Sequence, residues 1–243
     1  MGVPTLACHC AVCESTDPKD NRMRPSVLLE YRGRAVVIDT TPDFRSQALR
    51  IKLQRLDAVL YTHGHADHIL GLDDVRPFNG KQHRTVPIYG SPETLAILRR
   101  QFSYIFDPSP TVSSLPQIQL HEIEGPFDLF GARVVPVPAF HGPHPVLGYR
   151  VGAFGYLTDF SFIPDKSKEL LHNLDHFILD ALRYEPHPMH SNVAQSLALV
   201  EELKPKHAWF THICHDLGHK ETNAKLPETV RLSYDGLQFE VPL

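Results

Sequence analysis

No hydrophobic run in this 243-residue chain approaches the roughly 18 residues that a membrane-spanning helix requires. The opening segment, MGVPTLACHC, lacks the basic stretch and the apolar stretch of a secretory signal peptide. Lysine and arginine form no long run, and the net charge is −4, so no stripe that would attract nucleic acid is indicated. We therefore expect a cytoplasmic protein that binds neither a membrane nor nucleic acid.

The chain also lacks internal repeats, low-complexity tracts and a convincing linker. Hydrophobic residues make up 42% and charged residues 21%, and the mean hydropathy is −0.21. These values are typical of a globular protein, and the length is enough to bury a full core. We predict one domain over residues 1–243, with an N-terminal cysteine loop inside it at residues 1–25.

Cysteine is scarce, but three of the four cysteines lie close together, at Cys8, Cys10 and Cys13. Thiols stay reduced in the cytoplasm, so a disulfide framework is not expected. Three thiolates on one short loop suit a tetrahedral zinc ion, which then needs a fourth ligand. Cys214 and His215 are both candidates for that ligand. The alternative is three buried free thiols.

Hydrophobic periodicity predicts many strands and few helices. We expect a hairpin over residues 26–31 and 34–39 and a second one around Asp235-Gly236. Helical spacing predicts helices over 92–104 and 191–203, with Ser91 and Ser191 as N-caps. The remaining strands are expected over 57–61, 118–123, 133–139, 146–151, 153–157, 176–179, 207–210, 229–233 and 237–241. This mixture favours a layered α/β fold with a mixed sheet.

Sixteen histidines are present, and several follow predicted strands. The segment after residues 57–61 reads His63-x-His65-x-Asp67-His68, which places four potential ligands within six residues. Gly64 and Ala66 leave little bulk in that loop. Imidazole and carboxylate ligands suit zinc, manganese, iron or nickel. We infer a metal site, because scattered structural histidines seldom cluster in this way.

Other strand exits carry His141, Asp159 and His212, which would complete two metal positions. Each of the three taken alone would fit an ordinary structural role as well. Two cations about 3.5–4 Å apart would clamp the oxygens of a phosphoryl or acyl centre and would lower the pKa of a bridging water. The pattern therefore predicts a hydrolase with two metal ions.

These residues resemble the metallo-β-lactamase superfamily, whose T-H-x-H-x-D-H loop matches Thr62–His68 and whose later ligands match in order. The resemblance implies an α/β fold, an αββα sandwich of two mixed β-sheets flanked by helices. It implies Asp39 as a residue that supports the metal loop from behind. It assigns His63, His65 and His141 to one metal site, Asp67, His68 and His212 to the other, and Asp159 as the bridge.

The cysteines narrow the resemblance to the phosphoribosyl cyclic phosphodiesterase branch, which has a structural zinc on three cysteines and one histidine. The matching histidine here is His215, three residues after His212. The branch also has a histidine that contacts the substrate phosphate, and the matching residue is His190, 22 positions before His212. We predict Asp67 and His190 as catalytic residues. The alternative for His190 is a surface residue near a helix start.

The chain departs from the family at its start, where Gly2–Pro4 falls inside a turn that usually follows a first strand. We expect that strand to be absent, either because the start is assigned late or because the sheet edge is covered in another way.

The resemblance implies hydrolysis of a small cyclic phosphate, such as phosphoribosyl 1,2-cyclic phosphate, by a hydroxide that bridges the metal ions. It implies two active-site ions, manganese or zinc with iron or nickel as alternatives, one structural zinc, a small phosphorylated substrate and a homodimer.

The metal loop does not discriminate against an acyl hydrolase, meaning a thioesterase or lactonase. A non-catalytic accessory protein of cofactor biosynthesis is a further alternative. A tRNA 3′-end nuclease would need a basic arm that we do not find, and a redox di-iron protein would usually have glutamate in place of His65.

Overall fold

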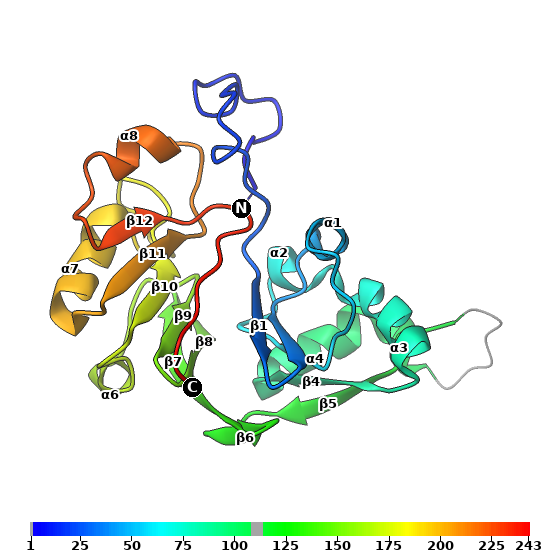
Figure 1. The fold of residues 1–243 in the computed structure, drawn as a ribbon. Coiled ribbons are helices and arrows are strands. Elements are labelled where there is room, and N and C mark those ends of the chain that lie inside the picture. The colour runs from blue at the N-terminus through cyan, green and yellow to red at the C-terminus, as the bar shows by residue number, and fades with distance from the viewer. Residues whose placement is uncertain (1, 108–113) are drawn as a thin grey trace. The chain divides into compact units, whose positions relative to one another are not determined.

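The computed structural model describes residues 2–107 and 114–243. The chain divides into two compact units. Unit 1 comprises residues 1–23 and 125–243, and unit 2 comprises residues 24–124. Each unit contains one β-sheet with its own helices (Figure 1).

Unit 2 is built on a five-stranded sheet with the order β1-β2-β3-β4-β5. β1 runs antiparallel to β2, because the two form a hairpin at Arg32-Gly33, whereas β2 through β5 are parallel neighbours. The predicted first hairpin is therefore confirmed. The strands are β1 (Val27–Tyr31), β2 (Arg34–Ile38), β3 (Ala58–Leu60), β4 (Val86–Gly90) and β5 (Ile118–Glu122).

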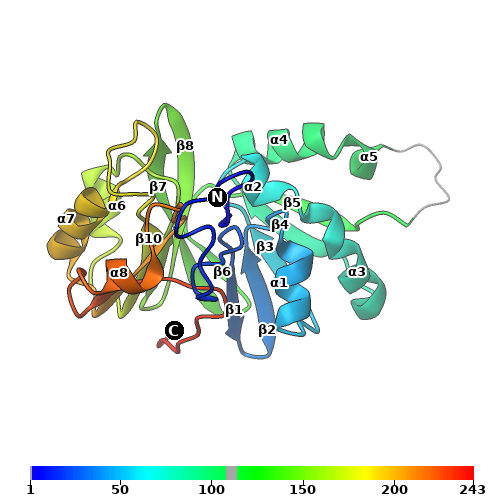
Figure 2. The ribbon, with the colours of Figure 1, turned by 90° about the horizontal axis from the view of Figure 1, so that it is seen from above.

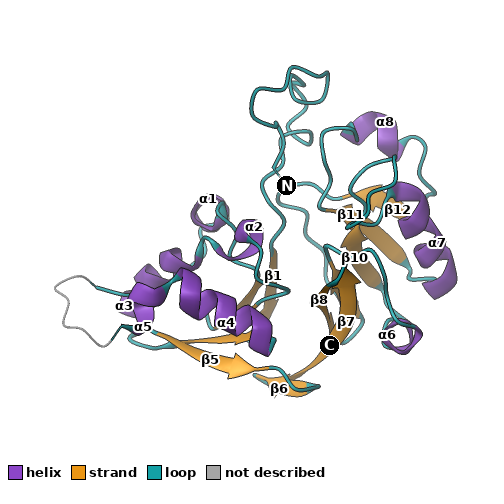
Figure 3. Ribbon diagram, turned by 180° about the vertical axis from the view of Figure 1, so that it is seen from behind, coloured by secondary structure: helices purple, strands orange, loops and turns teal. Residues whose placement is uncertain are grey.

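Helices of unit 2 bury their apolar residues against this sheet, and α3 and α4 lie along one side of it (Figure 3). Leu95 and Leu98 of α4 join Val59 and Ile88 of the central strands in one core. α4 begins after Ser91, whose side chain accepts a hydrogen bond from the Thr94 backbone, and α5 continues beyond it along the chain (Figure 2). The helices are α1 (Phe44–Arg50), α2 (Ala66–Ile69), the 3₁₀ helix η1 (Leu72–Val75), α3 (Arg76–Gln82), α4 (Pro92–Gln101) and α5 (Ser103–Phe106).

Unit 1 is built on a seven-stranded sheet with the order β12-β11-β10-β9-β8-β7-β6. β9 through β12 are parallel, while β6, β7, β8 and β9 follow one another as antiparallel neighbours. β7 and β9 therefore run in the same direction. The strands are β6 (Phe127–Leu129), β7 (Ala132–His141), β8 (His144–Val151), β9 (Phe154–Leu157), β10 (His176–Asp180), β11 (His207–Thr211) and β12 (Val230–Leu232).

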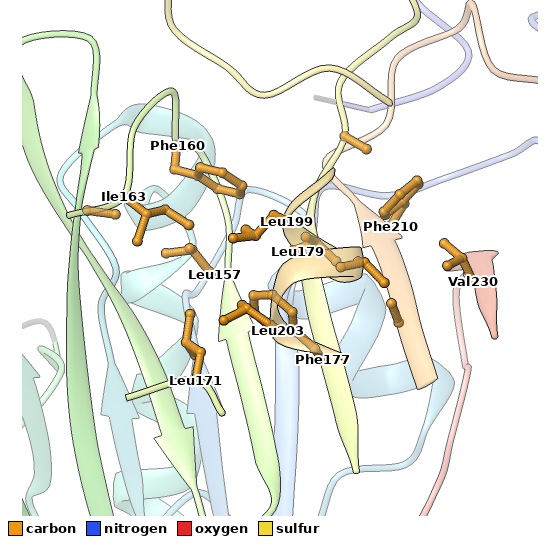
Figure 4. Close-up of a cluster of buried hydrophobic side chains, with 14 of the residues drawn as sticks. Leu157, Phe160, Ile163, Leu171, Phe177, Leu179, Leu199, Leu203, Phe210 and Val230 are labelled. Carbon is orange, nitrogen blue, oxygen red and sulfur yellow. The ribbon is translucent and has the colours of Figure 1, made fainter. Parts of the chain in front are cut away.

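The core of unit 1 lies between this sheet and α7 (Val193–Leu203). Leu199 and Leu203 of α7 pack with Phe177 and Leu179 of β10 (Figure 4). Two shorter helices, α6 (Asp165–Glu169) and α8 (His219–Asn223), complete the helices of the unit. The apolar stripe of α7 is what the spacing of its leucines predicts.

Two mixed sheets flanked by helices confirm the predicted fold class. Two local predictions were wrong. The N-cap of α7 is Asn192 rather than Ser191, because Asn192 and Gln195 form a reciprocal capping box. The Asp235-Gly236 hairpin does not form: β12 pairs with β11 in parallel, and the Asp235 carboxylate instead accepts the Met23 N–H.

The prediction of one domain over residues 1–243 and the prediction of a missing first strand stay predictions. No helix in the described part of the chain is both long enough and apolar enough to cross a bilayer.

Candidate metal centre

The first set of predicted ligands lies in unit 2, on the loop after β3 and on α2. The ring of His63 lies 4.6 Å from the ring of His65 and 4.3 Å from that of His68, so the loop gathers these histidines. A Cβ at Gly64 would lie 2.5 Å from Cδ1 of Ile97, so a larger residue would push the loop away from α4. Any side chain at this position would therefore require Ile97 to shift, in agreement with the small residue noted in the sequence.

Asp39, at the end of β2, is fully buried and holds this loop from behind. Its Oδ2 lies 2.7 Å from Nδ1 of His68, and it accepts the Thr62 hydroxyl at 2.7 Å. Since a carboxylate only accepts, His68 carries its proton on Nδ1. The Thr62 hydroxyl donates to Asp39 and therefore accepts from Nδ1 of His63 at 3.0 Å. Both rings then present Nε2 as the ligand atom.

The electrostatics of Asp39 follow from its burial. Burial raises the pKa of this carboxyl, while His68 and the hydrogen bonds from Thr62 lower it. The Oδ2 atom of Asp67 lies 3.9 Å from Nε2 of His68, as expected for two residues that would share one ion. Asp67 is the acidic residue of the first turn of α2.

The second set of predicted ligands lies in unit 1. The carboxyl ends of β7, β9 and β11 point to the same edge of the seven-stranded sheet, because these strands run in the same direction. His141 ends β7, Asp159 follows β9 and His212 follows β11. The parallel arrangement therefore brings together residues that are far apart in the sequence.

Hydrogen bonds orient these side chains. His141 donates from Nδ1 to the Met189 carbonyl at 2.6 Å, which leaves Nε2 as its ligand atom. The Thr158 hydroxyl donates to Oδ1 of Asp159 at 2.6 Å. Oδ2 of Asp159 lies 3.4 Å from Nε2 of His212. A carboxylate and an imidazole at this separation can bind one cation between them.

His190 lies among these ligands. Its ring centroid is 4.5 Å from that of His141 and 4.9 Å from that of His212. Only 12% of its side chain is exposed, so it is not the surface residue that was the alternative. Its Nδ1 donates to Oδ2 of Asp180 at 2.9 Å.

Asp180 was missed by the sequence reasoning. It is fully buried, and burial raises its pKa well above the usual value. One oxygen from each of Asp159 and Asp180 and one nitrogen from each of His190 and His212 lie within 4.8 Å of one another. The sequence did contain a signal for Asp180, because this residue ends β10 in the same way that Asp39 follows β2. A strand-end carboxylate next to the predicted strand 176–179 could have been added to the candidates.

Three of the strand-end residues share an unusual backbone. Asp39, Asp159 and His212 have φ values of 62°, 53° and 53°, in the left-handed region that side chains other than glycine seldom adopt. Each turns the chain sharply as it leaves its strand. Strain of this kind is typical of functional sites, where the surrounding structure holds the residue in place.

The cysteine loop forms a separate cluster within unit 1. The Sγ atoms of Cys8, Cys10 and Cys13 lie 3.1, 3.5 and 3.5 Å from Nδ1 of His215. A tetrahedral zinc ion with ordinary bond lengths would separate sulfur and nitrogen by roughly 3.6 Å. The four residues therefore fit a zinc ion, and His215 rather than Cys214 is the fourth member.

The pKa values of the thiols distinguish Cys10 from Cys214, whereas burial raises the pKa of Cys13 as it does that of Cys214. A hydrogen bond from the Cys13 backbone lowers the pKa of Cys10 to about 6, which favours the thiolate that zinc binds. Burial raises the pKa of Cys214 to about 11, so that thiol stays protonated. Cys214 is 5% exposed and belongs to the core next to the cluster.

Arg22 ties the cysteine loop to the segment that carries His215. Its guanidinium donates to the carbonyls of Cys214 and Leu217 at 3.3 and 2.6 Å and to Asp20 at 3.0 Å. Asp20 in turn accepts the His219 N–H at 2.7 Å. This buried pair positions the two parts of the cluster, which are about 200 residues apart in the sequence.

A family model described as "Beta-lactamase superfamily domain" matches residues 34–213. The chain belongs to the metallo-β-lactamase superfamily. A crystal structure of a "new diphosphatase from the PhnP family" is 51% identical, with a TM-score of 0.94, over 100% of this chain and 94% of that one. The chain is thus a member of this superfamily in the PhnP branch, and its clusters of histidine and aspartate could hold metal ions.

Two curated relatives carry other names. An octanoyltransferase of Porphyromonas gingivalis is 35% identical over 98% of this chain and 49% of that protein. A ribonuclease Z of a Mycobacterium species is 32% identical over 55% of this chain and 53% of that protein. The chain spans about half the length of the curated relatives that it matches.

Proposed function

We propose that this chain is a metal-dependent phosphodiesterase that acts on a small phosphate diester, such as phosphoribosyl 1,2-cyclic phosphate. The observation that carries the proposal is the position of His190, which lies beside His141 and His212 and is held by Asp180. An imidazole at this place suits a phosphate oxygen or a leaving alkoxide, both of which need a hydrogen-bond donor.

The predicted ligands of units 1 and 2 are imidazoles and carboxylates, a set that fits manganese or zinc. Their tautomers support this use, because His63, His68 and His141 each carry the proton on Nδ1. Two bound ions would neutralise charge on the phosphate oxygens and lower the pKa of water. We assign His63, His65, His141, Asp67, His68, His212 and Asp159 to these ions, and Cys8, Cys10, Cys13 and His215 to a structural zinc.

The chain's own residues would handle the proton. Nδ1 of His190 donates to Asp180, so the carboxylate stabilises the ring when Nε2 is also protonated. That proton would pass from Nε2 to the departing oxygen as a water oxygen bonds to phosphorus and the bond to the departing oxygen breaks. Asp39 stays behind the loop and keeps His68 oriented while the substrate reacts.

Two relatives bear on the choice of substrate. The diphosphatase that is 51% identical favours chemistry at phosphorus, and it makes cleavage of a diphosphate bond the second candidate. Because one relative is named an octanoyltransferase, the experiment also tests for acyl hydrolase activity, although this chain matches only half of that protein. A small phosphorylated substrate is part of the proposal, and the predicted homodimer stays a prediction.

The test is a substrate panel with the manganese-loaded and zinc-loaded protein. It compares phosphoribosyl 1,2-cyclic phosphate, a nucleoside diphosphate ester, bis(p-nitrophenyl) phosphate and an acyl thioester. We expect hydrolysis of the phosphate diesters that requires Asp67, so Asp67→Ala should lose it. Faster cleavage of the diphosphate ester would establish the second candidate instead, and turnover of the thioester alone would refute both.

The role of His190 has its own test. His190→Ala should lower kcat about 10²-fold or more for a substrate with an alkoxide leaving group. The loss should be much smaller for bis(p-nitrophenyl) phosphate, because p-nitrophenolate leaves without a proton. His172→Ala, which removes an exposed histidine of the same unit, should leave both rates unchanged. Equal losses on both substrates would show that His190 does not protonate the leaving group.

A further inference from the structure

A cluster of cationic side chains lines a cavity in unit 2 that is open to solvent, and all of its lining residues belong to that unit. The cavity has a volume of about 530 Å³. No carboxylate is among its lining residues in the described part of the chain, although the whole chain has a net charge of −4. The cations that line it are Arg32, Arg34, Arg55, Lys81 and Arg84.

The topology of the sheet explains why these residues converge. β2, β3 and β4 are parallel, so their amino-terminal ends share one edge. Arg34 begins β2, Arg55 precedes β3 and Arg84 precedes β4. The carboxyl-terminal ends of β2 and β3 lead to the metal loop instead. The cavity therefore lies at the opposite edge of this sheet from His63 and Asp39.

Two of the arginines are held in place by one buried carboxylate. Arg55 donates to Asp57 through Nε and NH2 at 2.7 and 2.6 Å, and Arg34 donates at 3.0 Å. The Ala35 N–H donates to the same carboxylate at 2.9 Å. Burial disfavours the ionised carboxylate, but the arginines more than offset this and hold the pKa of Asp57 below its usual value. Asp57 is 8% exposed, while Arg34 and Arg55 remain 35% and 45% exposed.

The opposite wall is also fixed. The Gln82 amide makes two hydrogen bonds to the backbone of Leu56, at 2.7 and 2.9 Å. Nζ of Lys81 donates to the Gln54 side chain at 2.6 Å. The loop before β3 and the end of α3 are thereby joined, and Lys81 and Arg84 line the cavity together with Arg34.

The charge count indicates the kind of ligand. Five cations line the cavity, and Asp57 is bonded to two of them, Arg34 and Arg55, so positive charge is in excess there. Like charges this close repel one another unless an anion lies between them. A phosphate monoester carries about 1.5–2 negative charges at neutral pH, so two phosphate groups match the excess. Arginine binds phosphate through paired N–H donors, which suits this composition.

We propose that this cavity binds a small ligand with two phosphate groups, at a site separate from the predicted metal ligands. The shared chemistry is the phosphate pair, which a sugar bisphosphate or a nucleoside diphosphate can supply. Fructose 1,6-bisphosphate and adenosine 5′-diphosphate are the two probes that distinguish these sources. Either one suffices for the proposal if it binds at this cavity.

The experiment combines titration calorimetry with hydrogen exchange on the intact, metal-loaded protein. Arg32→Ala/Arg84→Ala is the test variant, because both residues are exposed and neither bonds Asp57. Arg45→Ala/Arg100→Ala removes two exposed arginines elsewhere in unit 2 and serves as the charge-matched control. We expect the test variant to bind at least about tenfold more weakly and the control to bind as the wild type does.

Hydrogen exchange places the ligand. Protection over residues 32–35, 54–57 and 81–84 is the expected result. Protection confined to residues 62–68 would show that the probe binds only at the metal loop and would overturn the proposal. Equal weakening in test and control variants would also overturn it, because that result reflects general charge. Thermal unfolding of both variants checks the fold, and Arg84→Glu provides a second variant if the double substitution is unstable.

Discussion

His68 donates its Nδ1 proton to Oδ2 of Asp39 across 2.7 Å, and neither side chain is exposed to solvent. The same oxygen accepts the hydroxyl of Thr62, which in turn orients His63. One buried carboxylate at the end of β2 therefore sets the tautomers of two predicted ligands. The metal loop depends on a residue that lies outside it in the sequence.

Replacing Asp39 tests this dependence. Asp39→Asn keeps the size of the side chain but turns one acceptor into a donor that faces His68. We expect the affinity for the active-site metals to fall about ten- to hundredfold. Metal content after dialysis against metal-buffered solutions measures the change. Asp74→Asn on η1 is the matched control, and equal metal retention in both variants would contradict the role of Asp39.

Asp180 positions His190, and its removal should affect the proton step more than substrate binding. We expect Asp180→Asn to lower kcat about ten- to hundredfold for a substrate with an alkoxide leaving group, with a smaller change in KM. The loss with bis(p-nitrophenyl) phosphate should be smaller. Asp175→Asn, which breaks a surface ion pair with Lys206, is the control. A uniform loss on both substrates would assign Asp180 a purely structural role.

The cysteine cluster predicts a zinc ion that His215 binds and Cys214 does not. His215→Ala should lose one equivalent of zinc and lower the Tm by about 5–10 °C, because metal binding is coupled to folding of the loop. Cys214→Ala should retain the zinc. Metal analysis and calorimetry measure both effects. Retention of all zinc by His215→Ala would refute the assignment.

His176 predicts a pH dependence of stability. Trp209 donates from Nε1 to Nδ1 of His176 at 3.1 Å, and the His176 ring stacks on Phe239 at 4.0 Å. The hydrogen bond from Trp209 needs Nδ1 of His176 without a proton, so it is lost when the ring becomes charged. Burial lowers the pKa of His176, and neighbouring His207 lowers it further. With the folded-state pKa below the unfolded value of about 6.5, this stabilisation is complete above pH about 6.5 and is lost as pH falls through the folded-state pKa.

The measurement is thermal unfolding at about pH 7.5 and pH 5. The advantage in Tm of the wild type over His176→Phe should shrink at the lower pH. His172→Ala alters an exposed histidine and should follow the wild type at both values. An advantage that stays constant between the two conditions would exclude His176 as a source of the pH dependence.

Several features were predictable from local sequence. The segment His63-x-His65-x-Asp67-His68 carries its ligands within six residues, so their spacing in the sequence brings them together. The first hairpin and the Ser91 cap were predicted correctly for the same reason. The fold class followed from the resemblance and from the mixture of strands and helices, and the structure confirms it.

Errors arose where a distant segment competes with a local signal. Asp235-Gly236 is a strong hairpin sequence, but β12 pairs with β11 and Asp235 accepts the Met23 N–H. Ser191 looks like the cap of α7, yet its N–H donates to Phe160 and Asn192 forms the cap. Propensity describes the isolated segment, whereas the folded chain chooses among all available partners.

The sequence by itself determined the ligand types, the order in which they occur and the presence of three thiols within six residues. Only the tertiary structure decided that His215 rather than Cys214 completes the cysteine cluster and that Asp180 holds His190. Adjacent residues such as Cys214 and His215 point in different directions, and parallel strands join side chains tens of residues apart. Direction and long-range pairing are properties of the folded backbone, so spacing along the chain does not contain them.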